Sequence, residues 1–393
     1  MSHSYQRALS IKQQTVDWRR QFHRHPELSF AENRTSAFIT DRLREFGLEV
    51  ETDVGKTGVV GLLRGEPDWP CIMLRFDMDA LPLSEQNQVD YCSQEQGRIH
   101  ACGHDAHMAI GLSVAKLLSE SPEKPRSTIK FVFQPAEEIG LGAKAMIADG
   151  VLENPQPDFA LGVHVWNERP IGWVGASSGA VMAGSDVFSL RITGKGGHGA
   201  APHQSTDPIV AAAQVINGLQ TIVSRNVDPL DQAVVSLGSI HGGEAKNIIP
   251  EEVQIGGTLR FYNETTQQLL HRRINEIVNG TLAAMNCKGD FVLNQSTKPV
   301  INDSALTLRA IKAFQSLSLG LTIDTNYRTL ISEDMAYFLN MVPGVFLFVG
   351  CGSLDQDKRF PHHHGCFNID EECMTIAVAF LLEMVEELDH ETV

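Results

Sequence analysis

The segment CIMLRFDMDALP (Cys71–Pro82) gives the first clear sign of the fold, because an unbroken apolar run ends in two acidic residues. Three more short apolar runs follow along the chain: TIKFVF (128–133), FALGVHV (159–165) and GVFLFVG (344–350). Apolar residues recur at helical spacing over residues 1–50 and again from Ala106 to Leu118. Strands that are apolar throughout and separated by helices are typical of a mostly parallel sheet covered on both faces. The sequence therefore predicts an α/β fold.

The segment 184–296 has a different pattern. After a strand, DVFSLRITG, the pair Asp207-Pro208 begins a helix that runs to about Arg225, with Asp as N-cap and Pro at the first helical position. Two strands (AVVSLGSI and VQIGGTLRFY), a second helix (about 265–285) and a last strand (DFVLNQ) follow. The order β-α-β-β-α-β is that of a ferredoxin-like unit.

The length of the chain also favours two domains. Its 393 residues exceed the ~250–300 residues at which a single core usually stops growing. We expect a discontinuous catalytic α/β domain of residues 1–183 and 297–393, with a ferredoxin-like α+β domain inserted at 184–296. A single continuous sheet through the whole chain is the alternative.

Charge and composition narrow the class of protein. The formal net charge is -16, which repels nucleic acid, so no DNA or RNA partner is expected. The N-terminus lacks the apolar core of a signal peptide, and no apolar run approaches the ~20 residues of a membrane-spanning helix, so no membrane association is expected. The 7 cysteines show no disulfide pattern, which predicts reduced thiols and a cytoplasmic location.

Residues that can bind metal gather at the ends of the expected strands, where open α/β sheets bind ligands. Asp77 and Asp79 follow the first strand and could bind a metal or orient its ligands; a solvated loop is the alternative. The segment HACGHDAH, just before a helix, contains four such residues: Cys102, His104, Asp105 and His107. Thiolate and imidazole are natural ligands of zinc and similar ions. A nucleophilic Cys102 with a histidine base is the competing interpretation.

Three further segments add candidates. Glu137 and Glu138 in FQPAEEIG point different ways, so one can bind metal while the other moves a proton; a helix N-terminus would account for one of them. His164 lies in an apolar strand, where a hydrogen-bonded core histidine is the alternative. FPHHHGCF (360–367) is either a metal contributor or a polar loop. Together the candidates exceed the three ligands of a mononuclear catalytic zinc, so two ions fit best.

These segments, in this order, resemble the M20 metallopeptidase family, and most closely its amidohydrolase branch of aminoacylases, hippurate hydrolases and plant hydrolases of auxin–amino acid conjugates. The resemblance runs from HRHPELSF (His23–Phe30) to HHHGCFNIDEE (His362–Glu372), and the combination of DMDALP, ACGHDAH, QPAEE and GVHV makes it specific. It implies a zinc-peptidase-like catalytic domain whose inserted domain acts as a lid and in dimerisation.

The resemblance also implies roles for individual residues. Five would be metal ligands, with Cys102 bridging two ions: Cys102, His104, Glu138, His164 and His363. Glu137 would be the general base, and Asp77 and Asp79 would support the ligands from behind. His363 stands four residues before Phe367, where the family has its last ligand. Around it the sequence departs from the family, with His362 in place of the usual Leu and Gly365 in place of the usual Pro.

The inserted segment matches the family as well. GKGGHGAAPH (Gly194–His203) resembles the lid signature, in which His198 would help to polarise the scissile carbonyl. Asn247 in KNIIP and Arg260 in GGTLR fall where related enzymes contact the substrate carboxylate. The family resemblance also implies a lid that closes and a homodimer or homotetramer.

The expected reaction is the hydrolysis of an N-acyl amino acid, with Glu137 moving the proton of a metal-activated water. The expected cofactors are two divalent ions; Zn, Mn, Co and Ni all suit these ligands. The expected partner is a small molecule, an N-acyl amino acid or a dipeptide. The alternatives are a metallo-carboxypeptidase or dipeptidase on short peptides, a non-catalytic metal-dependent binding protein, and a thiol enzyme using Cys102.

Overall fold

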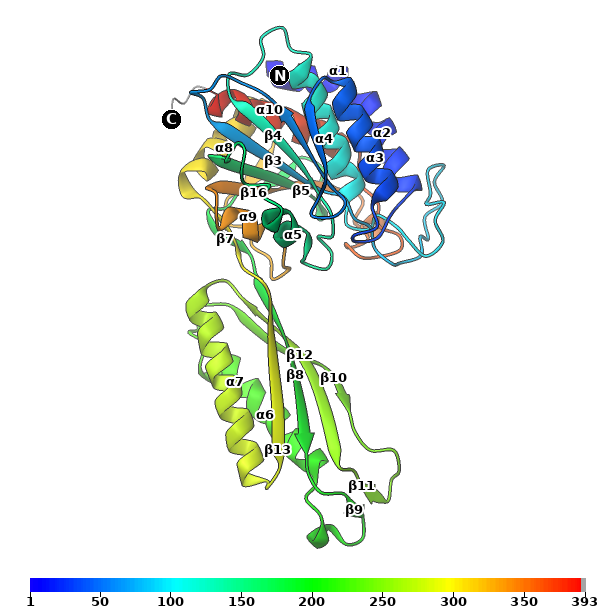
Figure 1. Cartoon of the computed structure of the whole chain (residues 1–393), viewed down its shortest axis with the longest axis vertical. Helices are drawn as coiled ribbons and strands as arrows, with labels where there is room; N and C mark the ends of the chain where they lie inside the picture. Colours follow the sequence, from blue (N-terminus) through cyan, green and yellow to red (C-terminus); the bar gives the residue numbers. More distant parts are fainter. Residues whose placement is uncertain (390–393) are drawn as a thin grey trace. The chain divides into compact units, whose positions relative to one another are not determined.

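The computed structural model describes residues 1–389, and the chain divides into two compact units (Figure 1). Unit 1 comprises Met1–Val181, Val300–Arg328 and the chain from Asp334 onward, and unit 2 comprises Met182–Pro299 and Thr329–Glu333. The sequence pattern does not indicate the second segment of unit 2. It belongs there because Met182 pairs with Thr329 and the Ala183 N–H donates to the Ile331 carbonyl at 3.0 Å.

Unit 1 is built on an eight-stranded sheet with the order β1-β2-β4-β3-β5-β16-β6-β15. Its four central strands, β4, β3, β5 and β16, are parallel, and they contain the four apolar runs of the sequence. The pairs β1–β2, β2–β4 and β6–β16 are antiparallel. The strands are β1 (Glu49–Val54), β2 (Gly58–Leu63), β3 (Cys71–Asp77), β4 (Thr128–Gln134), β5 (Phe159–Pro170), β6 (Trp173–Gly175), β15 (Thr322–Asp324) and β16 (Gly344–Gly352). The predicted α/β class is confirmed, whereas the alternative of one continuous sheet is wrong.

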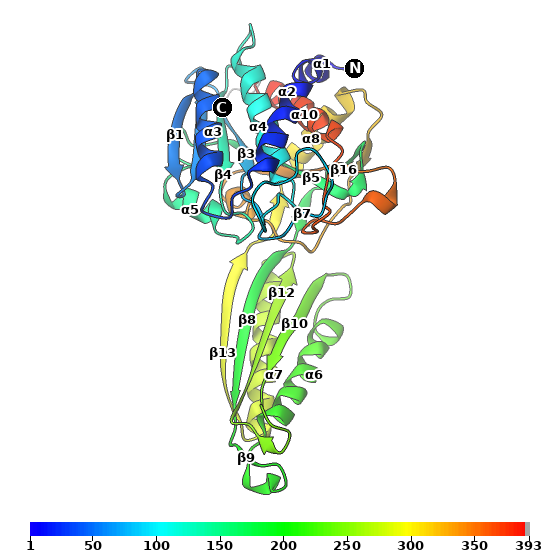
Figure 2. The ribbon, with the colours of Figure 1, turned by 90° about the vertical axis from the view of Figure 1, so that its right-hand side faces the viewer.

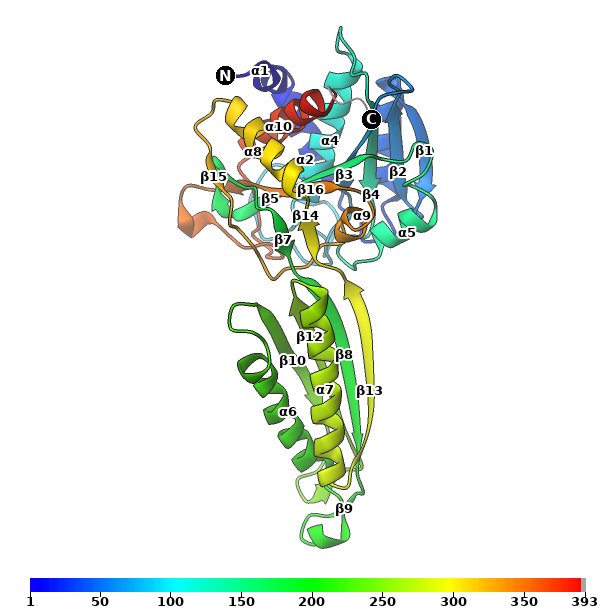
Figure 3. The same cartoon turned by 90° about the vertical axis from the view of Figure 1, so that its left-hand side faces the viewer.

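Helices cover both faces of this sheet, with α4 and α10 on one side and α5 and α9 on the other (Figures 1 and 3). The α-helices of unit 1 are α1 (His3–Ser10), α2 (Lys12–Arg24), α3 (Asn33–Glu45), α4 (His104–Ser119), α5 (Gly142–Ala148), α8 (Ser304–Ser316), α9 (Ala336–Leu339) and α10 (Glu372–Leu388). A short 3-10 helix (Gln356–Lys358) and the small sheet of β7 (Gly179–Met182) and β14 (Val300–Asn302) complete the described elements around this sheet.

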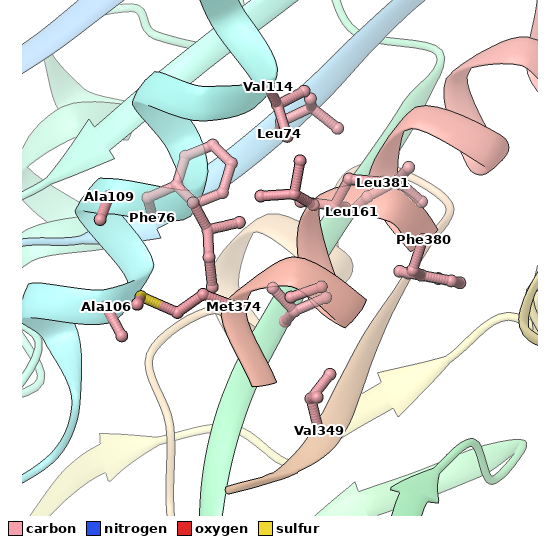
Figure 4. Close-up of a cluster of buried hydrophobic side chains, with 14 of the residues drawn as sticks. Leu74, Phe76, Ala106, Ala109, Val114, Leu161, Val349, Met374, Phe380 and Leu381 are labelled. Carbon is pink, nitrogen blue, oxygen red and sulfur yellow. The ribbon is translucent and has the colours of Figure 1, made fainter. Parts of the chain in front are cut away.

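The core of unit 1 lies between the parallel strands and the helices α4 and α10. Figure 4 shows Leu74 and Phe76 of β3 facing Val114 of α4 and Leu381 of α10. Full burial of one such side chain contributes ~1.5–3 kcal/mol, so this face fixes the strands firmly. Alternate residues of β3 point to the opposite face, which leaves Arg75 for a polar network described below.

Unit 2 contains a four-stranded antiparallel sheet with the order β10-β12-β8-β13, and α6 and α7 pack on one face (Figure 2). Its elements are β8 (Gly184–Thr193), β9 (Gly197–His198), a 3-10 helix (Pro202–Gln204), α6 (Pro208–Arg225), β10 (Ala233–His241), β11 (Ile248–Ile249), β12 (Glu252–Phe261), α7 (Glu264–Ala284) and β13 (Lys288–Thr297). The side chain of Asp207 accepts hydrogen bonds from the Ile209 and Val210 amides, which confirms the predicted cap. The β-α-β-β-α-β order is also present.

Two predictions about compartment can be compared with the structure. In the described part of the chain, no helix has both the length and the hydropathy needed to cross a bilayer. The seven cysteines are free thiols in the structure.

Candidate metal centre

The predicted metal-binding segments meet at the carboxyl edge of the parallel strands in unit 1. β3 ends at Asp77, which stands opposite Gln134, the last residue of β4. Two residues separate the end of β4 from Glu137 and Glu138, and His164 lies within β5, on the other side of β3. Because parallel strands end at a common edge, residues distant in sequence converge there.

The loop that carries Cys102 and His104 depends on Gly103. Gly103 has a φ of 92°, in the left-handed region, and a Cβ at this position would lie 2.3 Å from Cγ2 of Val165. Glycine alone meets both demands. The helix α4 then begins at His104, so Cys102 lies just before the helix and His104 lies in its first turn.

The first candidate ligand group consists of Cys102, His104 and His164, whose ligand atoms all lie within 4.8 Å of one another. His104 donates from Nδ1 to the backbone carbonyl of Asp79 at 2.8 Å, and its buried Nε2 has no hydrogen-bond partner in the described chain. His164 donates from Nδ1 to the Val165 carbonyl at 2.8 Å, and its Nε2 lies 3.6 Å from Sγ of Cys102. Both rings therefore turn an Nε2 lone pair toward the thiol, as metal-binding histidines do.

The second candidate group consists of Cys102, Glu138 and His363. Nε2 of His363 lies 3.2 Å from Oε2 of Glu138, and the buried Oε1 of Glu138 has no hydrogen-bond partner among the described residues. The neighbouring His362 instead points to the Val165 carbonyl, at 3.1 Å, and packs against Trp166. Of the three consecutive histidines, the structure thus brings His363 to the group.

Cys102 belongs to both groups, and this sharing suits two ions with one bridging sulfur. The unpartnered buried atoms, His104 Nε2 and Glu138 Oε1, are what a bound cation would satisfy. Thiolate, imidazole and carboxylate donors suit zinc and other divalent transition ions. The residues present therefore fit a pair of metal ions.

The clustered groups of this site shift one another's pKa values. Hydrogen bonds to Cys102 and Glu138 raise the pKa of His363 to about 10. Burial lowers the pKa of His104, but the neighbouring Asp77 and Cys102 outweigh it and raise that pKa well above its usual value. Burial raises the pKa of the Cys102 thiol. Metal and protons compete for the same atoms, so binding of an ion is expected to release protons.

Asp77 lies behind the first group and is buried. Its Oδ1 accepts a hydrogen bond from Nδ1 of His107 at 2.5 Å, and its Oδ2 accepts one from Arg75 at 2.7 Å. Oδ2 of Asp77 is 3.7 Å from Nε2 of His104. Burial opposes ionisation, but His104, His107 and Arg75 together hold the pKa of Asp77 well below its usual range. The site therefore has an anionic carboxylate next to a candidate ligand histidine.

Asp79 fixes the segment of the two glutamates. Its Oδ1 and Oδ2 accept hydrogen bonds from the backbone amides of Glu137 and Glu138 at 3.0 and 3.1 Å. The Ser29 hydroxyl donates to Oδ2 at 2.6 Å. Since the Asp79 carbonyl also orients His104, this one residue connects the ligand histidine to the glutamate segment.

The three predicted residues of unit 2 lie at two places. His198 is exposed on β9 and pairs with Ile248 of β11, and the Gly199 N–H donates to the Asn247 carbonyl at 2.8 Å. This loop joins the sheet at the start of β12, where the Gly194 N–H donates to the Glu251 carbonyl. The structure therefore brings His198 and Asn247 together.

Arg260 lies near the other end of β12. It stands opposite Ser185 of β8, whose hydroxyl accepts a hydrogen bond from Nη1, and it is half-buried. Arg260 lies eight positions after Glu252 along the strand, which corresponds to roughly 27 Å. Within one copy of unit 2, Arg260 is thus far from His198 and Asn247.

Residues 73–387 match the model of peptidase family M20/M25/M40. The chain belongs to this family. It is 39% identical over 379 residues to the N-acetyl-L-cysteine deacetylase of Bacillus subtilis (strain 168), covering 96% of this chain and 89% of the relative. It is 37% identical over 393 residues to the IAA-amino acid hydrolase ILR1-like 4 of Arabidopsis thaliana, covering 96% and 88%. The crystal structure of the YXEP protein of Bacillus subtilis, described as a dinuclear metal binding peptidase from the M20 family, matches with a TM-score of 0.84 at 32% identity, covering 98% and 99%.

A polar network lies beneath the site of this M20/M25/M40 chain. The sequence gives little sign of it beyond Arg75, a charged residue in an apolar strand. Arg75 of β3 donates to Gln134 at 2.8 Å and to Asp334 at 3.0 Å, and Gln134 donates to Asp334 at 2.7 Å. Asp334 also accepts the Ala143 amide at 3.0 Å. The network fixes the ends of β3 and β4, from which Asp77 and the glutamate segment project.

A second buried network supports the start of α4. Asp105, next to the candidate ligand His104, accepts hydrogen bonds from Arg19 at 3.0 Å and from Nδ1 of His23 at 2.7 Å. Nε2 of His23 lies 3.1 Å from Glu85. His23 belongs to the segment HRHPELSF, which is part of the family resemblance. The sequence of this segment does not predict the contact of His23 with Asp105. Removing one partner of a buried charge pair typically costs ~3–5 kcal/mol, so the start of α4 is firmly held.

Proposed function

We propose that this chain is a metal-dependent amidohydrolase that releases an amino acid from an N-acyl amino acid. The observation that carries the proposal is the position of Cys102, whose sulfur belongs to two ligand groups, with Glu137 in a further group beside them. The names of the N-acetyl-L-cysteine deacetylase and of the IAA-amino acid hydrolase support an amide bond to an amino acid as the bond that is cut.

The two groups would hold two divalent ions, one at Cys102, His104 and His164 and the other at Cys102, Glu138 and His363. Ions bound there would lower the pKa of a water molecule toward ~7 and polarise the amide carbonyl. The YXEP structure, described as a dinuclear metal binding peptidase, supports the number of ions. Zn, Mn, Co and Ni all suit these donors.

Glu137 is the proposed general base. One of its carboxylate oxygens lies within 4.8 Å of the ligand atoms of His104 and Glu138. Glu138 is engaged by His363 at 3.2 Å, which favours the ligand role for Glu138 and the proton-transfer role for Glu137. Glu137 would take the proton of the attacking water and pass it to the leaving amine, a role that typically contributes ~10²–10⁴-fold in rate.

Unit 2 would recognise the substrate. His198 is exposed, and its Nδ1 accepts the Ala200 amide at 3.0 Å, so its Nε2–H would donate to the scissile carbonyl oxygen. Arg260 would bind the substrate carboxylate, since a guanidinium matches a carboxylate in shape and charge. Asn247 would donate its side-chain amide to the same carboxylate.

A homodimer would reconcile the positions of these residues. The loop of His198 joins unit 2 at the start of β12, and Arg260 lies roughly 27 Å further along this strand, which exceeds the reach of a small substrate. We infer that one active site uses His198 of one subunit and Arg260 of the other. Apolar side chains exposed along α6 and β10, Ile209, Val210, Val223 and Ile240, would suit the contact between subunits.

The unpaired cysteines support a reducing compartment such as the cytoplasm.

A hydrolysis panel tests the proposal. Metal-stripped and metal-reconstituted protein would be offered N-acetyl, N-benzoyl and indole-acetyl amino acids together with dipeptides, and the released amino acid would be measured. Hydrolysis of N-acyl amino acids by the reconstituted protein alone supports the proposal. Faster cleavage of dipeptides would indicate a peptidase, activity that resists chelators would indicate a thiol enzyme, and substrate binding without turnover would indicate a binding protein.

A further inference from the structure

A buried carboxylate of unit 1 holds the backbone next to the proposed base. Glu32, the N-cap residue of α3, is 0% exposed. Its Oε1 accepts a hydrogen bond from the Ala136 amide at 2.9 Å, and its Oε2 accepts one from the Thr57 hydroxyl at 2.6 Å. Ala136 directly precedes Glu137 in the chain. Glu32 therefore binds the backbone from which the base projects.

Two buried carboxylates together receive three consecutive backbone amides. Glu32 accepts the amide of Ala136, while Asp79 accepts those of Glu137 and Glu138. Consecutive N–H groups form an anion-binding concavity, and here carboxylates of the protein itself fill it. Asp79 fixes the peptide planes on both sides of Glu137, and Glu32 fixes the plane before Ala136.

The backbone at Ala136 requires such a hold. Its φ is 53°, in the left-handed region, where the Cβ of any residue except glycine crowds the backbone. Loss of the Glu32 acceptor would remove one of the bonds that keep Ala136 from relaxing toward a common conformation, and rotation at this position would swing the Glu137 side chain. Strained residues persist at functional sites when their surroundings hold them in place.

We propose that Glu32 is a positioning residue for Glu137, because its bond to the Ala136 amide maintains the backbone conformation that aims the Glu137 carboxylate at the metal ligands. This inference rests on the proposed function of Glu137 as the base. It assigns a role to a residue that touches neither the substrate nor a metal ligand.

Two variants of matched size test the role. Glu32→Gln keeps a carbonyl oxygen for the Ala136 amide, whereas Glu32→Met has a similar length and no acceptor. With metal content measured for each protein, we expect Glu32→Gln to retain most of kcat. Glu32→Met should lose on the order of 10²-fold in kcat with little change in KM, the cost typical of a misplaced catalytic group.

Glu27→Met is the control for a purely structural effect. Glu27 accepts the Arg34 and Thr35 amides at 3.1 and 2.8 Å in the first turn of the same helix, away from Ala136. The Glu27→Met variant should lower the unfolding free energy, as Glu32→Met does, but leave kcat unchanged. A wild-type kcat in Glu32→Met, or a loss of kcat that only follows a loss of metal, would overturn the positioning role.

A second change makes the test specific to the backbone. Glycine adopts the left-handed region without strain, so adding Ala136→Gly to Glu32→Met should restore part of kcat. A crystal structure of Glu32→Met tests the role without an activity measurement. In it, Ala136 should leave the left-handed region and the Glu137 side chain should shift. If wild-type protein hydrolyses nothing in the panel, the proposed function fails, whereas an unmoved Ala136 and Glu137 in that structure overturn the positioning role separately.

Discussion

His107 donates from Nδ1 to Oδ1 of Asp77 across 2.5 Å, while its Nε2 accepts the Val165 amide at 2.9 Å. Both ring nitrogens are thus occupied, although His107 lies close enough to Asp77 and His104 to form a further group of possible ligands. A histidine binds metal through a free lone pair, and His107 has none. Its bond instead holds Asp77 next to His104, a candidate ligand.

This relationship predicts different outcomes for two histidine variants. His107→Ala should still bind metal at saturating concentration, with an affinity ~10–100-fold lower, as is usual when a partner of a ligand is removed. His104→Ala should lose one ion per chain. Metal titration with elemental analysis distinguishes them, and loss of an ion from His107→Ala at saturation would make His107 a ligand.

The division of labour between the glutamates gives a second prediction. Glu137→Gln should keep the metal content of the wild type, because Glu138, which lies against His363, is the proposed ligand of the pair. Its kcat should fall by at least ~10²–10⁴-fold, the usual contribution of a general base. Glu138→Gln is the matched comparison and should lose metal as well as rate. A Glu137→Gln protein with near-normal turnover would refute the base assignment.

Much of the fold could be predicted from the sequence because its signals are local. The runs that begin at Cys71, Thr128, Phe159 and Gly344 are apolar over several residues, and they became the four parallel strands at the centre of the sheet. The Asp207-Pro208 cap is equally local. The return of Thr329–Glu333 to unit 2 has no local signal, since it depends on pairing with a residue far earlier in the chain.

The candidate site divides in the same way. Cys102 and His104 stand out because thiol and imidazole groups crowd one short segment. Arg75 and Asp334 are 259 positions apart and join only through the folded sheet. Glu32 resembles any helix-capping acid in the sequence, and its bond to the Ala136 amide depends on how α3 packs near the end of β4. Spacing reveals candidate ligands, but the residues that orient them are defined by tertiary contacts.

A third prediction concerns Cys102. Cys102→Ala should lose metal and activity together, since its sulfur belongs to both ligand groups. Cys366→Ala is the control, because this thiol lies near Gln86 and in neither group. Its kcat and metal content should match the wild type. If Cys102→Ala kept both ions and still lost activity, the thiol-nucleophile alternative would gain support over the metal-ligand role.

A fourth prediction concerns stability and pH. Burial lowers the pKa of His23, but hydrogen bonds to Asp105 and Glu85 outweigh it and raise that pKa above its usual value, against a smaller opposing effect of Arg19. The protonated ring therefore stabilises the fold fully below pH ~6.5, and this contribution is lost as pH rises through the raised pKa. The wild type should become less stable between pH 6 and pH 9.

His23→Gln isolates this contribution. The variant should be less stable than the wild type at pH 6, and the difference should shrink toward pH 9, with each unit of pKa worth about 1.4 kcal/mol. Urea unfolding at fixed metal concentration measures both proteins at each pH. A difference that does not vary with pH would show that His23 acts by packing alone.

The fifth prediction follows from the two ends of β12. If one active site takes His198 from one subunit and Arg260 from the other, His198→Ala and Arg260→Met should each be inactive alone. A mixed dimer then contains one site with both changes and one site with neither. Random exchange of subunits makes half of the dimers mixed, so the mixture should recover about a quarter of wild-type activity.

The controls for this mixing experiment separate assembly from catalysis. Mixing each variant with Glu137→Gln also tests whether one site takes residues from both subunits. Glu137 belongs to unit 1, so the pattern of recovered activity shows whether His198 or Arg260 acts in the same subunit as the base. If Arg260 and Glu137 act within one subunit, Arg260→Met and Glu137→Gln should not complement, whereas His198→Ala and Glu137→Gln should. Sedimentation of each mixture confirms that dimers have formed. Dimers that form without any recovery would place His198 and Arg260 in the same site of one subunit, which their positions at opposite ends of β12 could allow only with a long substrate.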